Sequence, residues 1–117
     1  MTPAAIKPLV TIDALQAIDV RVGTIESVDE IARSRKLVKL RVNFGDHTRQ
    51  ILAGLKQERD EPAEITGRQA LFVVNLSPKT MAGELSEGML FDIGYADGVR
   101  PVLSVPEAAV PNGTRAG

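Results

Sequence analysis

Residues 37–44 alternate between apolar and polar side chains, and this alternation constrains the fold more than any other feature of the sequence. Successive side chains of a β-strand point to opposite faces, so the two sets would lie on opposite sides of a sheet. One set is Val38, Leu40, Val42 and Phe44, and the other is Lys39, Arg41 and Asn43. The pattern predicts a strand with one face in an apolar core and one cationic face in solvent.

Other short apolar segments predict further strands. Gly45-Asp46 is typical of a hairpin turn, and Gly23 inside the first strand indicates a bulge or a sharp coil. The expected strands cover residues 20–27, 37–44, 48–53, 70–74, 89–93 and 99–105. Five or six short strands with little helix predict an all-β fold, a small antiparallel barrel. Periodicity alone does not distinguish an OB-fold from an SH3-like barrel.

The N-terminal region differs from the rest of the chain. Residues 1–10 contain two prolines and show no periodicity, which predicts a mobile arm, and residues 11–117 are expected to form one domain. A short helix is expected over residues 12–18, because Thr11 is a suitable N-cap and the apolar residues that follow share one face. That face needs a surface to pack on, either the barrel or a second subunit. One further helical turn is expected at residues 62–65.

Composition argues against several classes of function. The sequence has no cysteine and a single histidine, His47, so a metal site is not expected. It contains no recognisable catalytic motif, which predicts a binding module without cofactor and not an enzyme. Because the sequence has no export signal and no apolar run long enough to span a bilayer, we expect a cytoplasmic protein without membrane insertion.

The charge is distributed unevenly along the chain. A net charge of −1 argues against a nucleic-acid partner, because phosphate binding is driven by cations. Residues 33–56, however, contain seven Lys and Arg against one acid, whereas residues 57–64 contain four acids and one Arg. This distribution favours one basic face on an otherwise acidic molecule. A solvated surface with uneven charge is the alternative interpretation.

The segment from Asn75 to Met89 joins two apolar runs and has an unusual composition. Pro78 restricts the backbone, and Gly83 and Gly88 permit turns or a close approach. The segment presents four different polar or polarisable groups: the amide of Asn75, the ammonium of Lys79, the thioether of Met81 and the hydroxyl of Ser86. We therefore predict a functional loop between two core strands.

Four segments in the same order resemble the stand-alone tRNA-binding domain family, which includes the CsaA chaperones and the C-terminal appendix of bacterial methionyl-tRNA synthetases. The first is the Asn-x-x-Pro-basic-x-x-x-Gly-x-x-Ser pattern formed by Asn75, Pro78, Lys79, Gly83 and Ser86. The others are residues 19–25, 49–55 and 110–114. The resemblance implies a five-stranded OB-fold barrel with a short N-terminal helix and a C-terminal strand extension. It also implies a homodimer formed by these two extensions, with tRNA as the partner.

The aromatic residues indicate whether the chain would bind single-stranded or structured RNA. OB-folds that bind single strands stack bases on exposed rings. Phe44, Phe72 and Phe91 follow apolar positions of their strands, so Tyr95 is the one ring expected to be free. The sequence therefore favours structured RNA, recognised through phosphates, ribose and shape, or a polypeptide.

The RNA-binding residues expected from the basic face and the loop have distinct roles. Lys39, Arg41 and Arg49 would contact phosphates, with Arg35 and Lys36 at the rim, provided that the strand register places Arg49 with the others. In the loop, Lys79 would meet a phosphate, Met81 a base or sugar, and Asn75 and Ser86 a ribose or base edge. A structural role is the alternative for three of these residues. Asn75 could hold the loop backbone together, Ser86 could cap a turn, and Met81 could fill a gap in the core.

The competing function is chaperone-type binding of unfolded or preprotein polypeptide segments, which the CsaA proteins imply. Met81, Leu85, Met89 and the apolar face of the N-terminal helix could line a groove for such segments. A third interpretation is an accessory domain that delivers tRNA to a separately encoded enzyme.

Overall fold

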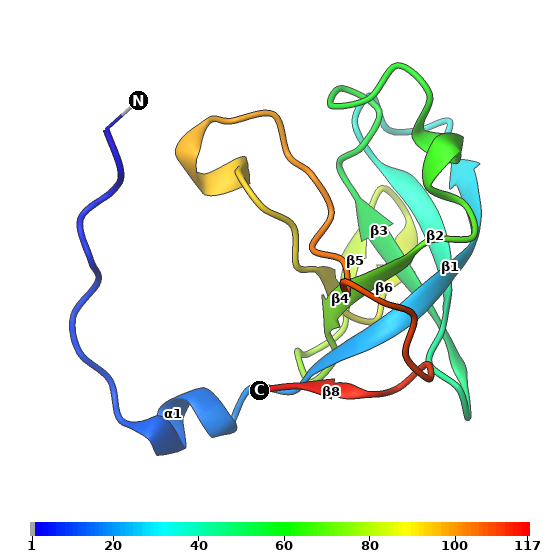
Figure 1. Cartoon of the computed structure of the whole chain (residues 1–117). Coiled ribbons are helices and arrows are strands. Elements are labelled where there is room, and N and C mark those ends of the chain that lie inside the picture. The colour runs from blue at the N-terminus through cyan, green and yellow to red at the C-terminus, as the bar shows by residue number, and fades with distance from the viewer. Residues whose placement is uncertain (1) are drawn as a thin grey trace.

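An antiparallel sheet curls around one apolar core in the computed structural model of the protein, which describes residues 2–117 (Figure 1). The strand order is β3-β2-β1-β4-β7, and β8 pairs with β1 beside this path. The bounds of these strands are β1 Val20–Glu30, β2 Val38–Asn43, β3 Thr48–Ala53, β4 Gln69–Val73, β7 Met89–Leu90 and β8 Arg115–Ala116. The expected all-β, OB-fold architecture is confirmed.

Strand β1 belongs to both halves of the barrel. Its first part, residues 20–24, pairs with β4, and residues 24–30 pair with β2, with a register shift between Ile25 and Ser27. Gly23 lies where the partner changes. A Cβ atom at this position would lie 2.5 Å from Val42 Cγ1 and 2.9 Å from the Phe44 ring. The strand can therefore cross the core here because glycine has no side chain.

The core lies inside the curl of the sheet. Val38, Leu40 and Val42 of β2 are buried, and Lys39 and Arg41 point outward, as the alternation predicts. The largest fully buried side chains come from every main strand and the 3-10 turn: Phe72, Ile25, Leu40, Ile51, Ile65, Val38 and Val42. The barrel thus supplies a rigid base for the polar outer face of β2 and β3.

The short helices lie at the edges of the barrel. Helix α1 spans Ile12–Gln16, and its first turn is capped by the Thr11 hydroxyl, which accepts a hydrogen bond of 3.3 Å from the Ala14 N–H. None of its residues is buried. The expected turn at residues 62–65 is the 3-10 helix η1, Pro62–Ile65, and a second 3-10 turn, η2, spans Tyr95–Asp97. The domain is preceded by an extended N-terminal arm, residues 2–11 (Figure 1).

Two expectations from the sequence are wrong in detail. The segment from residue 75 to 89 contains a hairpin, β5 Lys79–Met81 and β6 Glu84–Ser86, whose two turn residues Ala82 and Gly83 have positive φ values of 51° and 78°. The strand expected at residues 99–105 does not form. A single bridge joins Ile93 and Val102, and the Ser104 carbonyl accepts one hydrogen bond of 3.0 Å from the Leu71 N–H of β4. A regular ladder does not form, because Pro101 has no N–H to donate.

The close approach at Gly23 gives a stability prediction. We expect Gly23→Ala to lower the free energy of unfolding by about 1–3 kcal/mol, because the added methyl overlaps Val42 and Phe44. Urea denaturation measures the change. Gly54→Ala is the matched control, since its added methyl would meet only Glu58 Oε1 at 4.0 Å. Equal midpoints for the two variants would contradict the prediction.

Candidate nucleic-acid interface

Lys39 and Arg41 form the cationic outer face of β2, and each has an acidic neighbour. Lys39 Nζ lies 3.3 Å from Glu84 Oε1, and Arg41 Nε lies 3.3 Å from Glu26 Oε1. Both pairs are solvent-accessible, and such pairs contribute only about 0–1 kcal/mol. The two cations can therefore exchange these carboxylates for phosphates at little cost.

A groove of about 390 Å³ lies along this outer face. Its walls come from Ser27, Asp29, Lys39, Leu40, Arg41, Thr48, Arg49, Gln50 and Glu87. The structure thus brings three of the expected phosphate-binding cations to one concave surface. The acids in its wall reduce the local positive potential.

The guanidinium of Arg49 has a different environment from the other two cations. The register pairs Arg49 with the buried Val42, so its side chain starts on the core-facing side of β3. Its Nη1 donates to the carbonyl oxygens of Val74 at 2.6 Å and Glu87 at 3.1 Å. The guanidinium also lies 5.9 Å from the centre of the Phe44 ring. Arg49 therefore ties β3 to both ends of the segment from residue 75 to 89.

Asn75 joins the start of this segment to the N-terminal region. Its Oδ1 accepts a hydrogen bond of 2.8 Å from the Asp19 N–H, and its Nδ2 donates one of 2.7 Å to the Ala17 carbonyl. The amide thus spans the link between α1 and β1. These contacts match the structural role left open for Asn75, and its contact with RNA stays a prediction.

Ser86 and Glu87 cover the free edge of β3. The buried Ser86 hydroxyl accepts a hydrogen bond of 3.0 Å from the Leu52 N–H and donates one of 3.0 Å to the Gly88 carbonyl. The Glu87 N–H donates a backbone hydrogen bond of 2.8 Å to the Gln50 carbonyl, and the Gln50 N–H donates one of 3.3 Å to Glu87 Oε1. Edge strands need such cover because their unpaired backbone groups otherwise attract other chains. Ser86 is therefore a structural residue, whatever its relation to RNA.

The β5–β6 hairpin lies beside the basic segment that precedes β2. Glu84 of the hairpin contacts Lys39 and Gln50, and an Arg33 nitrogen lies 3.1 Å from the position of a Cβ at Gly83. In the hairpin, Lys79 pairs with Ser86 and is exposed. The hairpin thus carries the exposed Lys79 on a strand whose partner, β6, contacts β2 and β3.

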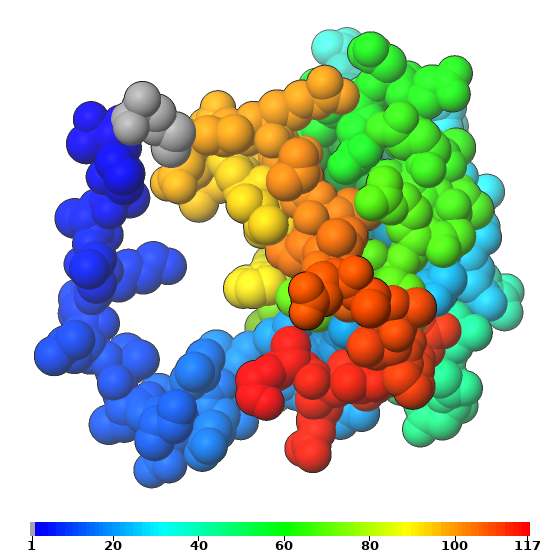
Figure 2. Space-filling model, viewed as in Figure 1, coloured from blue at the N-terminus to red at the C-terminus, as the bar shows by residue number. Residues whose placement is uncertain are grey.

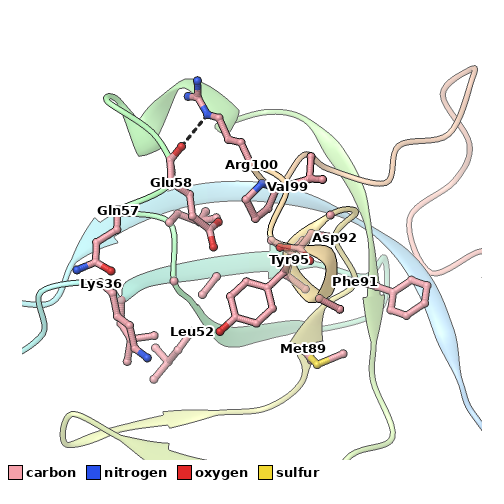
Figure 3. A pocket seen from close by; sticks show the side chains of 18 of the residues that line it. Lys36, Leu52, Gln57, Glu58, Met89, Phe91, Asp92, Tyr95, Val99 and Arg100 are labelled. Carbon is pink, nitrogen blue, oxygen red and sulfur yellow. Dashed lines mark hydrogen bonds between the residues drawn. The ribbon is translucent and has the colours of Figure 1, made fainter. Parts of the chain in front are cut away.

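The remaining expected residues lie near this hairpin. Arg35 and Lys36 are exposed in the segment before β2. Lys36 and the half-buried Met81 line one wide groove of about 1140 Å³, which opens between the end of β3 and the segment around η2 (Figure 3). Sequence reasoning did not single out Arg33 or Gln50 as site residues, because their contacts with the hairpin depend on how it folds over β3.

Two carboxyl groups have a pKa below its usual range. A hydrogen bond from Arg21 lowers the pKa of Asp19, to which Arg21 Nε donates at 2.9 Å. Contact with His47, 2.6 Å away, lowers the pKa of Asp46. His47 therefore has a carboxylate and the Arg49 Nε as neighbours and lies among charged turn residues. Within residues 2–117, no cluster of three or more metal-ligating side chains occurs, and no helix is long and apolar enough to cross a bilayer.

The sequence over this architecture matches a known family model. Residues 20–115 match the model described as a putative tRNA binding domain. The chain belongs to this tRNA-binding domain family. The match covers the barrel, the β5–β6 hairpin and the C-terminal extension.

Curated relatives of this tRNA-binding domain include methionine–tRNA ligases. The protein is 38% identical over 107 residues to the ligase of Chlorobium luteolum and 42% identical over 110 residues to that of Methanococcoides burtonii. Each match covers 92% of this chain but only 15% and 16% of the respective ligase. The similarity thus concerns a small part of those enzymes.

Two solved structures, each matched over its whole chain, are also similar to this protein. The methionyl-tRNA synthetase related protein of Pyrococcus horikoshii has 33% identity and a TM-score of 0.85, covering 95% of this chain and all of the other. The chaperone CsaA of Bacillus anthracis has 27% identity and a TM-score of 0.81, covering 94% of this chain and all of its own. The sequence resemblance to both groups is confirmed.

The cover over β3 gives a second stability prediction. We expect Ser86→Ala to lower the free energy of unfolding by about 1–3 kcal/mol, because the Leu52 N–H loses its acceptor in a buried position. Thermal and urea denaturation measure it. Ser77→Ala, in the exposed part of the same segment, is the control and should leave stability within about 0.5 kcal/mol of the wild type. A stable Ser86→Ala variant would mean that water replaces the hydroxyl.

Proposed function

We propose that this protein binds tRNA, without catalysing a reaction, through the cationic surface of β2 and the β5–β6 hairpin. One observation supports the proposal: the hairpin that carries Lys79 is hydrogen-bonded to β3 and ion-paired with Lys39. The surface consists of Arg35, Lys36, Lys39, Arg41 and Lys79. Membership of the tRNA-binding domain family supports tRNA as the ligand, and tRNA binding implies a cytoplasmic location.

The proposed contacts are mainly electrostatic. Lys39 and Arg41 exchange their ion pairs with Glu84 and Glu26 for contacts with phosphates. Lys79 contacts a third phosphate. Arg35 and Lys36 extend the contact at the rim. Met81, half-buried at the groove edge, packs against a base or a sugar. Shape and phosphate spacing, more than base sequence, then select the RNA.

The other expected RNA-binding residues contribute mainly by positioning this surface. The Ser86 hydroxyl and the Nε and Nη1 of Arg49 are hydrogen-bonded within the protein, so these two residues help to hold the hairpin segment against β3. Asn75 is exposed and uses one of its two amide N–H groups on Ala17, which leaves the second for a ribose or a base edge.

The proposed tRNA-binding form is a homodimer. Ile12, Leu15 and Ile18 are exposed although they share the apolar face of the α1 region, and helix α1 buries none of its own residues. Apolar faces of this kind need a partner surface. A second copy related by two-fold symmetry supplies it through its own α1 and C-terminal segment.

Polypeptide binding is the second candidate function, and the wide groove favours it. Leu52, Met81 and Met89 contribute apolar wall to a volume of about 1140 Å³. Flexible methionine side chains adapt to varied ligands. Suppression of aggregation of an unfolded substrate, with little dependence on salt, would favour this function over tRNA binding.

Charge reversal on β2 tests tRNA binding. We expect Lys39→Glu with Arg41→Glu to weaken binding of total tRNA in a gel shift at least tenfold. The slope of log affinity against log salt should become shallower by about 1.5–2, because two phosphate contacts are lost. Arg68→Glu with Ala63→Glu and Thr66→Glu changes the net charge equally, at exposed positions outside this surface and outside the proposed dimer contacts, and is the control. Equal binding by both variants would move the RNA site elsewhere.

A single change in α1 tests the dimer. Light scattering at micromolar concentration should return twice the mass of one chain for the wild type. Leu15→Glu should shift the protein towards the monomer, because it places a charge on the apolar face. Gln16→Glu alters the charge of the same helix at a polar position and should leave the mass unchanged. A monomeric wild type would exclude the dimer.

A further inference from the structure

The side chains of the N-terminal arm do not pack on the domain of their own chain. Ile6, Leu9 and Val10 are 95%, 97% and 76% exposed, values expected of an extended chain in solvent. Figure 1 shows the arm running from α1 on the side opposite to β2 and β3, and Figure 2 shows open space between the arm and the segment around η2. Large apolar side chains left in solvent by an extended arm indicate a surface on another molecule.

The wall of the wide groove beside η2 contains three acids, Glu58, Asp92 and Asp97, against two cations, Lys36 and Arg100. Glu58 and Asp92 both line it and are half-buried, and neither forms an ion pair within residues 2–117. Burial raises the pKa of both groups, and the nearby Asp92 raises that of Glu58 further. Figure 3 shows Glu58 and Tyr95 pointing into the groove from different walls. The site therefore favours a cation carried on an apolar stem.

The N-terminal arm carries a cation that would balance the excess of acid in this groove. Residues 2–11 contain one charged side chain, the cation Lys7, and no acid. Apolar residues flank it on both sides, Ile6 before it and Pro8-Leu9 after it. Proline keeps the segment extended, which lowers the entropy lost on binding.

We propose that the groove binds the N-terminal arm of a second copy of this chain, with the Lys7 ammonium at the carboxylates of Glu58 and Asp92. Ile6 and Leu9 pack on the apolar wall that Leu52 and Met89 contribute. The inference rests on the homodimer proposed above and adds to it a reciprocal exchange of arms. Because the arm then occupies the groove, it competes with any polypeptide for the same site.

The way the arm is attached to its barrel supports the proposal that the arm in the groove comes from a second copy of this chain. Asn75 fixes the link between α1 and β1 through Ala17 and Asp19, which sets the direction in which α1 and the arm leave the barrel. The chain's own groove stays open although its arm carries the complementary side chains. Two copies related by symmetry fill both grooves at once, so one contact stabilises the dimer twice.

Charge exchange between copies tests the inference. Lys7→Glu and Asp92→Lys, each alone, should raise the dimer dissociation constant about tenfold or more, because like charges then meet in both grooves. An equimolar mixture of the two variants should recover the wild-type constant to within about threefold, since each arm of the mixed dimer meets an opposite charge. Analytical ultracentrifugation with one variant fluorescently labelled measures all three.

Matched controls and outcomes separate this inference from the proposed function. Arg68→Glu and Asp60→Lys make the same charge changes at exposed positions outside the groove and should leave the constant unchanged. Variants that dimerise like the wild type overturn the exchange of arms and leave the dimer intact. A mixture that stays as dissociated as the single variants overturns it too, because the opposite charges of the mixed dimer would then not meet between copies. A monomeric wild type overturns the inference, and tRNA binding is then tested separately by the gel shift.

Discussion

The hydrogen bonds that cover the free edge of β3 are the constraint on which the rest of the structure depends. A curled sheet of this size leaves an edge, and the Leu52 N–H at that edge is buried. Ser86 supplies the acceptor and Glu87 a backbone bond, so the segment after the hairpin completes the barrel. The hairpin is consequently fixed to the core, and the cation at Lys79 takes its position relative to β2 from a buried contact.

A chain of contacts continues from this edge to the N-terminal helix. Arg49 donates to the Val74 carbonyl, the Val74 N–H donates to Asp19, and the Asn75 amide bonds both Asp19 and Ala17. Three positions that sequence reasoning assigned to RNA binding thus hold the architecture together. Loss of the Asn75 or the Ser86 side chain would free a segment that positions other side chains, so both residues have a structural role whatever their relation to RNA.

The sequence predicted the parts of the fold that depend on local periodicity. The alternation of β2 placed its buried and cationic faces correctly. Gly23 indicated an irregularity in β1, but the register shift lies between Ile25 and Ser27, just after Thr24, which pairs with both β4 and β2. The hairpin was missed because its turn uses Ala82 at positive φ, without the Asn-Gly or Asp-Gly pair that signals such turns. The direction of Arg49 depended on the register of β2 with β3, a tertiary property that counting back from the buried Ile51 could have suggested.

The pairing of cations with acids affects how the proposed surface would distinguish a folded RNA from an unstructured polyanion. Lys39 and Arg41 are compensated by Glu84 and Glu26 in the free protein, so their field at a distance is weak. An unstructured polyanion that touches one cation at a time gains little by displacing each carboxylate. A rigid RNA whose phosphates match the spacing of several cations displaces them together and loses little entropy of its own. Partnered cations on a rigid base therefore reduce non-specific attraction more than they reduce binding to a surface of matching shape.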